Sequence, residues 1–152
     1  MNDTPKQTPR GHHAAEVLGR AIADGTPPVG GTFTIVEAIR RTGTGKSSTR
    51  EGLLALQAKG VVSLKKSTGI TVQPVGRWSL LDPDVARWAS GTVAAKQVAY
   101  DAMVVRDALA GIDGNNVLVR QIRDAVAVLL YGGARNEEDG LPAQVGTGGN
   151  NG

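Results

Sequence analysis

The sequence predicts a mainly α-helical protein with one small β-hairpin. In several stretches of its 152 residues, apolar side chains recur at the three- and four-residue spacing of amphipathic helices. Two short β-branched runs, Val61–Leu64 and Ile70–Val72, flank the basic, glycine-containing segment 65–69, which is the pattern of a hairpin. The chain has no cysteine and only five aromatic residues, so we expect an aliphatic core without disulfides or thiolate-bound metal.

The first two predicted helices are separated by a rigid turn. Residues 1–10 contain no apolar run and are expected to be flexible. A first helix is predicted over His12–Asp24, where five apolar residues form one stripe before Gly25. The paired prolines and paired glycines of residues 26–32 cannot continue a helix. A second, short helix is then predicted over Thr34–Arg41.

A third helix is predicted after the tight glycine turn of residues 42–47. Ser48 and Glu51 have the spacing of a capping box and are expected to open this helix, which ends at Lys59-Gly60. Its Leu53 and Leu56 are expected to face the core. The opposite, polar side of the helix is expected to carry Lys46, Ser47, Arg50 and Gln57.

Beyond residue 75 the sequence predicts helices without strands. Residues 76–91 are expected to form a linker with one short helix, because Pro83 after Asp82 suits a first helical turn. Longer helices over residues 92–110 and 116–131 predict a helical hairpin. Its apolar stripes are predicted to consist of Val98, Ala102, Val105 and Leu109, and of Leu118, Ile122, Ala125, Val126, Leu129 and Leu130. Residues 132–152 hold seven glycines and are expected to form a disordered tail.

This order of elements is that of a winged helix-turn-helix over residues 11–75, followed by a helical hairpin over residues 92–131. In a winged helix-turn-helix the third helix enters the major groove of DNA. Residues 1–75 carry ten Lys or Arg against five Asp or Glu, whereas residues 76–152 carry seven against nine. The basic N-terminal half favours a polyanionic partner, and we expect double-stranded DNA.

Candidate DNA-contacting residues follow from this arrangement. The third helix and its start contribute Lys46, Ser47, Ser48 and Arg50, and the tip of the wing contributes Lys65, Lys66 and Gly69. Arg40 and Arg41 end the second helix, where a phosphate contact and a solvated helix end explain them equally well. The sequence offers no catalytic constellation and no metal or cofactor motif, so we do not expect an enzyme.

Two short motifs resemble sites of other kinds and fit them poorly. Gly45-Lys-Ser47 could end a phosphate-binding loop, but that motif needs a preceding strand and a glycine at the position of Arg40. His12 and His13 are adjacent, so they cannot face one metal as residues four apart on a helix do. No apolar run reaches the ~20 residues that span a bilayer, and the N-terminus lacks a secretory signal. We therefore expect a cytoplasmic protein without membrane contact.

Three motifs occur together and in order along residues 11–88. They are Gly43-Thr-Gly-Lys-Ser-Ser-Thr-Arg-Glu-Gly-Leu53, Leu56-Gln-Ala-Lys-Gly-Val-Val62, and Trp78 with Leu80-Leu-Asp-Pro83 and Trp88. These motifs resemble the GntR family of bacterial transcription regulators, in its FadR-like branch. There the first two read Gly-Val-Ser-Arg-Thr-Pro-Val-Arg-Glu-Ala-Leu and Leu-Glu-Ala-Glu-Gly-Leu-Val. The resemblance implies DNA contacts by Lys46, Ser47 and Arg50 and a wing tip at Gly69.

The chain also departs from that family. Val36 stands where members usually carry a DNA-contacting arginine, and Thr42 and Thr44 replace apolar residues that pack the turn. The family's ligand domain is a larger helical bundle that often binds a metal and a small carboxylate, whereas residues 92–131 resemble only a truncated remnant of that effector domain. No histidine follows His13, so the usual multi-histidine site cannot form and no small-molecule effector is assigned.

Two functions of different classes are consistent with the sequence. The leading hypothesis is a sequence-specific DNA-binding transcription regulator, a repressor, with an incomplete effector domain. The alternative is an interaction protein, or the remnant of a regulator, that pairs with a full-length paralogue and binds DNA weakly. A single helical hairpin buries its apolar stripe poorly, so a homodimer or a heterodimer with a full-length homologue is a further expectation.

Overall fold

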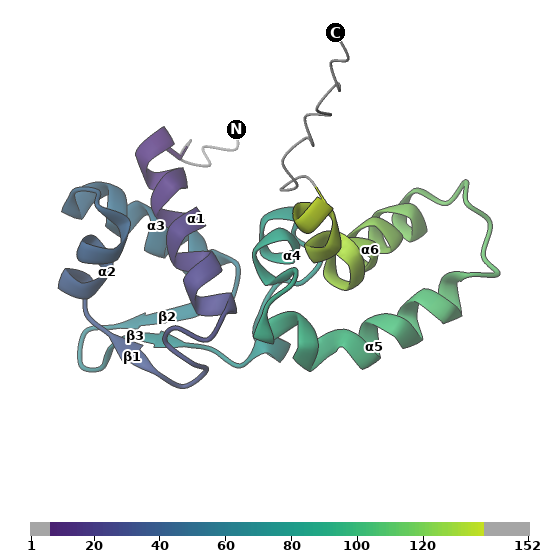
Figure 1. Cartoon of the computed structure of the whole chain (residues 1–152). Coiled ribbons are helices and arrows are strands. Elements are labelled where there is room, and N and C mark those ends of the chain that lie inside the picture. Colours follow the sequence, from purple (N-terminus) through teal and green to yellow (C-terminus); the bar gives the residue numbers. More distant parts are fainter. Residues whose placement is uncertain (1–6, 139–152) are drawn as a thin grey trace, which may run out of the picture.

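A computed structural model of the chain describes residues 7–138, and their side chains as far as residue 132. These residues form a mainly helical structure with a small antiparallel sheet of three strands (Figure 1). In chain order the elements are α1 (Pro9–Ala23), β1 (Thr32–Phe33), α2 (Ile35–Thr42), α3 (Lys46–Ala58), β2 (Val62–Lys65), β3 (Gly69–Val72), the short 3-10 helix η1 (Val75–Arg77), α4 (Pro83–Ala89), α5 (Val93–Leu109) and α6 (Val117–Glu138).

The sheet has one strand more than the predicted hairpin. β2 and β3 pair as expected, and β1 adds to the free edge of β3, with Phe33 opposite Ile70. Backbone hydrogen bonds from Gly30 N to Val72 O and from Val72 N to Gly31 O, both 2.9 Å, extend this pairing. A two-residue strand is too short to show an alternating pattern, so no local pattern predicts it.

Helices α1 and α3 pack closely, and this contact forms the centre of the N-terminal core. A Cβ atom at Gly52 would lie 2.8 Å from the Cβ atom of Ala14, so only glycine permits this helix spacing. Leu53 and Leu56 are buried together with Leu18, which confirms that they face the core. Figure 1 shows the three-stranded sheet running below α1, α2 and α3.

The start of α3 differs from the prediction. α3 begins at Lys46 with Gly45 as its N-cap residue, so the predicted capping box of Ser48 and Glu51 is wrong. The Glu51 carboxylate instead accepts hydrogen bonds from the backbone N–H and, at 2.8 Å, from the hydroxyl of Thr8. The Thr8 hydroxyl in turn caps α1, which therefore begins at Pro9, inside the segment predicted to be flexible.

A cluster of threonine hydroxyls holds the turn between α2 and α3. Gly43 has a φ angle of +65°, which lets the chain turn immediately after α2. The Oγ1 atom of Thr49, a fully buried residue, lies 3.0 Å from the Oγ1 atoms of both Thr42 and Thr44. Hydrogen bonds therefore fix this turn where the resemblance to the regulator family implies apolar packing.

We expect Thr49→Val to destabilise the protein by about 1–3 kcal/mol, because it removes a buried hydroxyl and leaves the hydroxyls of Thr42 and Thr44 short of a partner. Urea denaturation measures this change. Ser48→Ala is the matched control, since the Ser48 hydroxyl has no hydrogen bond among the described residues, and it should change the stability by less than about 0.5 kcal/mol. Equal losses for both variants would contradict the role of the cluster.

The predicted linker, residues 76–91, is packed into the core rather than exposed. The Trp88 ring lies directly over Gly19 of α1, where a Cβ atom would come within 2.5 Å of the ring. Arg87 pairs with Glu16 of α1. The other buried residues of this segment are Trp78, Val85, Ala86 and Ala89. α4 therefore joins the N-terminal helices to the C-terminal pair.

Asp82 connects the end of α3 to the start of α4. Its carboxylate accepts hydrogen bonds from Nζ of Lys59 at 2.6 Å and from the backbone N–H groups of Asp84 and Val85 at 2.9 and 3.2 Å. Burial has the largest single effect on the carboxyl group and raises its pKa. The Lys59 ammonium and the two backbone donors together outweigh burial, so the pKa of Asp82 is lowered from its ordinary value.

Asp82→Asn keeps a cap acceptor but removes the negative charge. Because the folded-state pKa is lowered, this charge stabilises the fold above the unfolded-state pKa of ~3.9, and the stabilisation is lost as the pH falls through the folded-state value. We expect the variant to be less stable than the parent by about 1 kcal/mol near neutral pH and equally stable in acid below both pKa values. Urea denaturation across this range measures the difference, and a pH-independent difference would argue against it.

The C-terminal helices form a hairpin whose buried face differs in part from the prediction. Ala102 of α5 is buried as expected, as are Ala125, Val126 and Leu129 of α6. Val105 and Leu118, which also belong to the predicted stripes, are 38% and 64% exposed, so the hairpin itself leaves them uncovered. α6 packs against α4 as well as α5, and Figure 1 shows the loop between α5 and α6 at the end of the hairpin away from α4.

Both ends of the chain extend beyond the described residues. α6 continues to Glu138, into the segment predicted to be a disordered tail, and the remainder of that segment, residues 139–152, lies outside the described residues. Most of the predicted flexible N-terminus, residues 1–6, also lies outside them. Among the helices of residues 7–138, none combines the length and apolar character that a membrane span requires.

Candidate nucleic-acid interface

One face of α3 is turned to solvent and carries the predicted cationic residues. Lys46, Ser47 and Arg50 are exposed on this face, whereas Thr49 and Leu53 are buried on the other side of the helix. The periodicity of the sequence therefore separates the two sides as predicted. The buried side fixes α3 against α1, and the exposed side is presented on a rigid support.

The N-terminus of α3 adds its own positive potential to these side chains. Its N-cap residue, Gly45, has no side chain to accept a hydrogen bond from the first backbone N–H groups. Uncapped N–H groups at a helix start, together with the helix dipole, favour an anion such as phosphate. Lys46 is the first residue of the helix and lies at this end. The helix start therefore combines two independent sources of attraction for a polyanion.

The cations of this interface have no acidic partner within the part of the chain that the structure describes. Lys46, Arg50, Lys65 and Lys66 take part in none of the ion pairs found among residues 7–138. In contrast, Arg87 pairs with carboxylates outside this interface. A charge that is not neutralised within the protein remains available for a phosphate or a base edge.

Ser48 occupies a different position from its neighbours. Its side chain is half-buried, at the border between the exposed and the buried side of α3. It does not cap the helix, as shown above. Of the four predicted residues in this region, Ser48 therefore presents the least surface to a partner.

The predicted wing residues lie at the turn between β2 and β3. Lys65 is the last residue of β2 and pairs with Gly69, the first residue of β3, so the two close the turn around the exposed Lys66. Gly69 has a φ angle of +74°, and a Cβ atom there would lie 3.2 Å from the carbonyl oxygen of Phe33. The turn is thus basic, and glycine at position 69 permits both its left-handed backbone and the close approach of β1.

Arg40 and Arg41 belong to the last turn of α2 and not to the exposed face of α3. They end α2 beside the turn that leads into β1, where they line a hollow of ≈ 240 Å³ together with Pro27, Thr32, Phe33 and Glu37. Arg41 donates a hydrogen bond from Nη1 to the carbonyl oxygen of Thr26, 2.7 Å away. This hydrogen bond gives Arg41 a role in holding the turn. The side chain of Arg40 is exposed, which agrees with a phosphate contact and with a solvated helix end alike.

Glu37 places a negative charge next to these two arginines. Its pKa is lowered chiefly by the backbone N–H of Thr34, then by the Thr34 hydroxyl, and further by the charges of Arg40 and Arg41. The carboxylate therefore stays ionised and offsets part of the positive charge at the end of α2. This end of α2 is a weaker attractor of phosphate than the start of α3.

One residue of the exposed α3 face was not among the predicted site residues. Leu54 lies one turn after Arg50 and is 51% exposed. Gln57, expected on the polar side, is exposed beyond it. The signal for Leu54 was its helical spacing from Arg50, since residues four apart share one face. From the sequence, Leu54 was assigned to neither side of the helix.

Other kinds of site find little support in the described residues. Within residues 7–138, no three His, Cys, Asp or Glu side chains come together in a group that could hold a metal ion. The segment Gly45-Lys-Ser47 follows helix α2, whereas a phosphate-binding loop of the nucleotide type follows a strand. The nucleotide interpretation therefore lacks its structural context as well as its first glycine.

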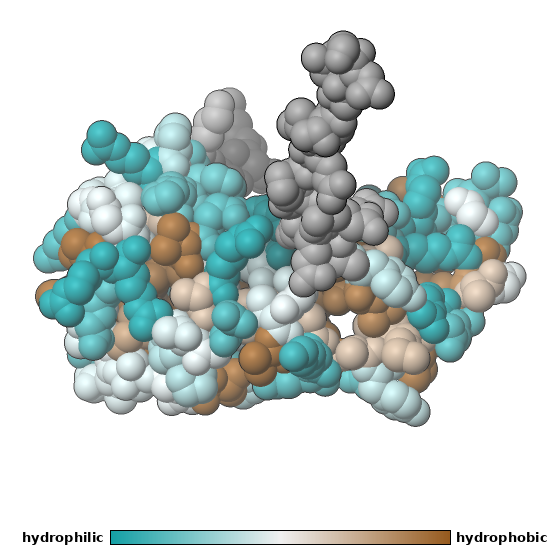
Figure 2. Space-filling view, in the orientation of Figure 1, coloured by the Kyte–Doolittle hydropathy of each residue, from teal (hydrophilic) through white to brown (hydrophobic). Residues whose placement is uncertain are grey.

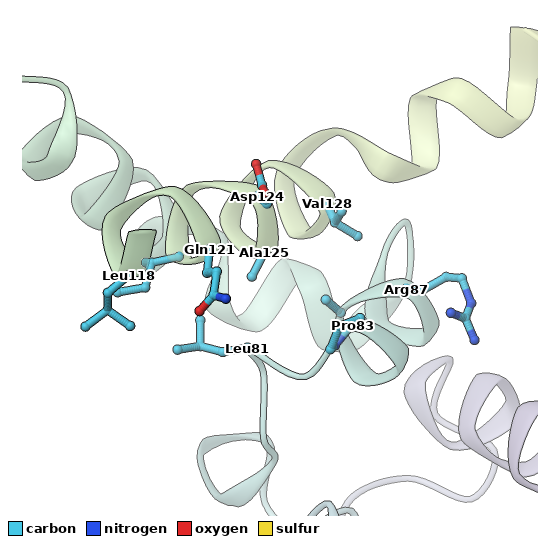
Figure 3. A pocket seen from close by; sticks show the side chains of 10 residues that line it. Leu81, Pro83, Arg87, Leu118, Gln121, Asp124, Ala125 and Val128 are labelled. Atoms are coloured by element: carbon cyan, nitrogen blue, oxygen red, sulfur yellow. The ribbon is translucent and has the colours of Figure 1, made fainter. Parts of the chain in front are cut away.

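A second candidate site is an apolar groove between α4 and α6. It has a volume of ≈ 600 Å³ and is lined by Leu81, Pro83, Ala86, Arg87, Leu118, Gln121, Ile122, Asp124, Ala125 and Val128. Figure 3 shows Leu118 and Gln121 of α6 above Leu81, and Ala125 above Pro83. Apolar side chains are also exposed over the half of the molecule that holds α5 and α6 (Figure 2). This half thus leaves apolar surface uncovered.

Compared with known protein families, with curated proteins and with solved structures, the chain gives no match in any of the three. Its function must therefore be inferred from its own residues.

Proposed function

We propose that this protein is a sequence-specific DNA-binding regulator that represses transcription. Its first three helices and sheet then form a winged helix-turn-helix of the kind found in FadR-like GntR regulators. The observation that carries this proposal is the exposed row of Lys46, Ser47 and Arg50 on a helix whose opposite side is buried. Neither a catalytic role nor a cofactor is part of the proposal.

In the proposed complex, α3 lies in the major groove with its exposed face toward the base edges. Lys46 and the free N–H groups of the helix start bind backbone phosphates, which position the protein without reading sequence. Arg50 lies one turn further along, where its guanidinium donates two hydrogen bonds to a guanine edge. The side chain of Ser47 is shorter, and its hydroxyl contacts a phosphate or a base. Discrimination between sequences thus depends mainly on Arg50.

The wing supplies a second attachment to the same duplex. Lys65 and Lys66 are long, flexible and unpaired within the described residues, and they bind phosphates beside the groove that holds α3. Gly69 permits the left-handed backbone that the turn between Lys66 and β3 requires. Occupation of a site that overlaps a promoter then excludes polymerase, and repression follows without any effector. The helical pair α5–α6 has no assigned ligand in this account.

Selection from random duplex DNA tests the proposal. We expect a short motif to be enriched and the dissociation constant for that motif to rise steeply with salt. The logarithm of the constant should rise by ~0.9 per neutralised phosphate for each tenfold increase in salt. An absence of any enriched motif, combined with binding that does not depend on salt, would contradict the proposal.

A second candidate function is that of an interaction protein that pairs with a second copy or with a full-length homologue and binds DNA weakly. The apolar groove between α4 and α6 favours it, since Leu81 and Leu118 are both exposed there. Solution mass measurement shows whether the chain is a monomer or a homodimer. Gel shifts then separate the two candidates. Tight binding by this chain alone supports the regulator, and binding only in mixture with a full-length homologue supports the partner protein.

A further inference from the structure

Leu54 is an apolar residue in the middle of an otherwise polar, exposed row. It follows Arg50 by four residues and precedes Gln57 by three, so all three lie on one face of α3. Its side chain is 51% exposed, while those of Leu53 and Leu56 on the same helix are buried. Leu54 therefore contributes little to the core and is presented to whatever α3 contacts.

A single exposed leucine is common on protein surfaces and carries no meaning by itself. The position of Leu54 between two polar residues of the same face is what makes its exposure informative. Any surface that contacts both Arg50 and Gln57 must also cover the side chain between them. That surface removes Leu54 from water, and this is favourable only where it offers an apolar group in return.

The major groove of DNA offers one apolar group on its base edges, the C5 methyl of thymine. Four residues of an α-helix rise ~6 Å along its axis, which is close to the rise of two base pairs. A base contacted by Leu54 thus lies about two base pairs from the one contacted by Arg50. We propose that Leu54 reads the methyl group of a thymine that lies about two base pairs from the guanine bound by Arg50. This inference rests on the proposed DNA-binding function and adds a specificity-determining residue to it.

Uracil provides a direct test, because it differs from thymine only by the absence of this methyl group. Within the motif selected from random DNA, each thymine is replaced in turn by deoxyuridine, and affinity is measured by fluorescence anisotropy. We expect one replacement to weaken binding about fourfold, the value of one buried methyl group. Leu54→Ala should bind the thymine site about as weakly as the parent binds the uracil site, and should no longer distinguish the two.

Arg50→Ala is the control, since it should weaken binding generally and keep the preference for thymine over uracil. Leu54 is half-exposed and alanine favours helices, so Leu54→Ala should fold normally, which circular dichroism verifies. Equal binding of thymine and uracil at every position of the motif would overturn the inference and leave the regulator proposal intact. Persistence of the preference in Leu54→Ala would overturn it too. Failure to select any motif would overturn both.

Discussion

Arg50→Ala is expected to cost about 1–3 kcal/mol of binding free energy at the selected DNA site and to relax the base preference at one position. The reason is geometric. The guanidinium is exposed on α3, one turn from the helix start, and it has no carboxylate partner among the ion pairs of the described residues. Fluorescence anisotropy with the selected duplex, and with duplexes altered at each position in turn, measures both effects.

Arg120→Ala provides the matched control for this prediction. Arg120 is an exposed arginine of α6, so its replacement removes the same charge from a part of the protein outside the proposed interface. We expect it to change the affinity for DNA little and the base preference not at all. Equal losses for the two variants, with an unchanged preference among altered duplexes, would show that Arg50 acts only through net charge and would contradict its assigned role.

Leu56→Ala is expected to reduce the free energy of unfolding by about 2–5 kcal/mol. Leu56 is 0% exposed and belongs to the cluster that joins α3 to α1 and to the sheet. Its truncation removes transfer free energy and leaves a cavity between elements that cannot fully close. Urea denaturation followed by circular dichroism measures the loss, and binding of DNA should fall in parallel because α3 loses its support.

Leu54→Ala is the matched variant on the same helix. It removes the same number of atoms from a side chain that is largely in water, and it should change the free energy of unfolding by less than about 1 kcal/mol. Comparable destabilisation by the two substitutions would contradict the division of α3 into a buried and an exposed side, and with it the basis of the proposed interface.

Local patterns predicted the elements of the N-terminal half well. The burial of Leu53 and Leu56 and the exposure of Lys46 and Arg50 follow from helical spacing alone, since both depend only on positions along one helix. The extra strand β1 could not be predicted in this way. Its pairing with β3 joins residues far apart in the sequence and shows no pattern in its two residues.

The wrong prediction of a capping box at Ser48 and Glu51 has a similar cause. The spacing is correct for a local cap, but the Glu51 carboxylate finds a partner in Thr8, 43 residues earlier in the chain. The hydroxyl cluster around Thr49 was also missed, because a buried threonine cannot be told from an exposed one by sequence type. At Glu51 a contact made by tertiary packing therefore replaced the predicted local one.

The C-terminal half shows the limit of periodicity most clearly. A helical stripe predicts that one side of α6 is buried, but not which neighbours bury it. α6 packs against both α4 and α5. Val126 and Leu129 are buried in this arrangement, whereas Leu118 remains exposed. Likewise, the segment around Trp78 and Trp88 reads as a linker by composition, although both rings are buried against the N-terminal helices.

Among the predicted site residues, the structure brings together those of α3 and those of the wing in two compact sets. Arg41 is tied to the Thr26 carbonyl, and Ser48 is half-buried, so neither presents its full side chain to a partner. Spacing could identify the exposed face, but it could not assign a hydrogen bond to a distant backbone carbonyl. Leu54 was overlooked because an apolar side chain is ordinarily assigned to the core.

Nuclear magnetic resonance of the isotope-labelled chain, titrated with a duplex that carries the selected motif, tests the central claim most directly. If α3 enters the major groove, the largest changes in backbone amide shifts should fall on residues 45–54, with a second set at the wing residues 65–69. Shifts of this size confined to the groove between α4 and α6, or an absence of shifts at α3, would contradict the account.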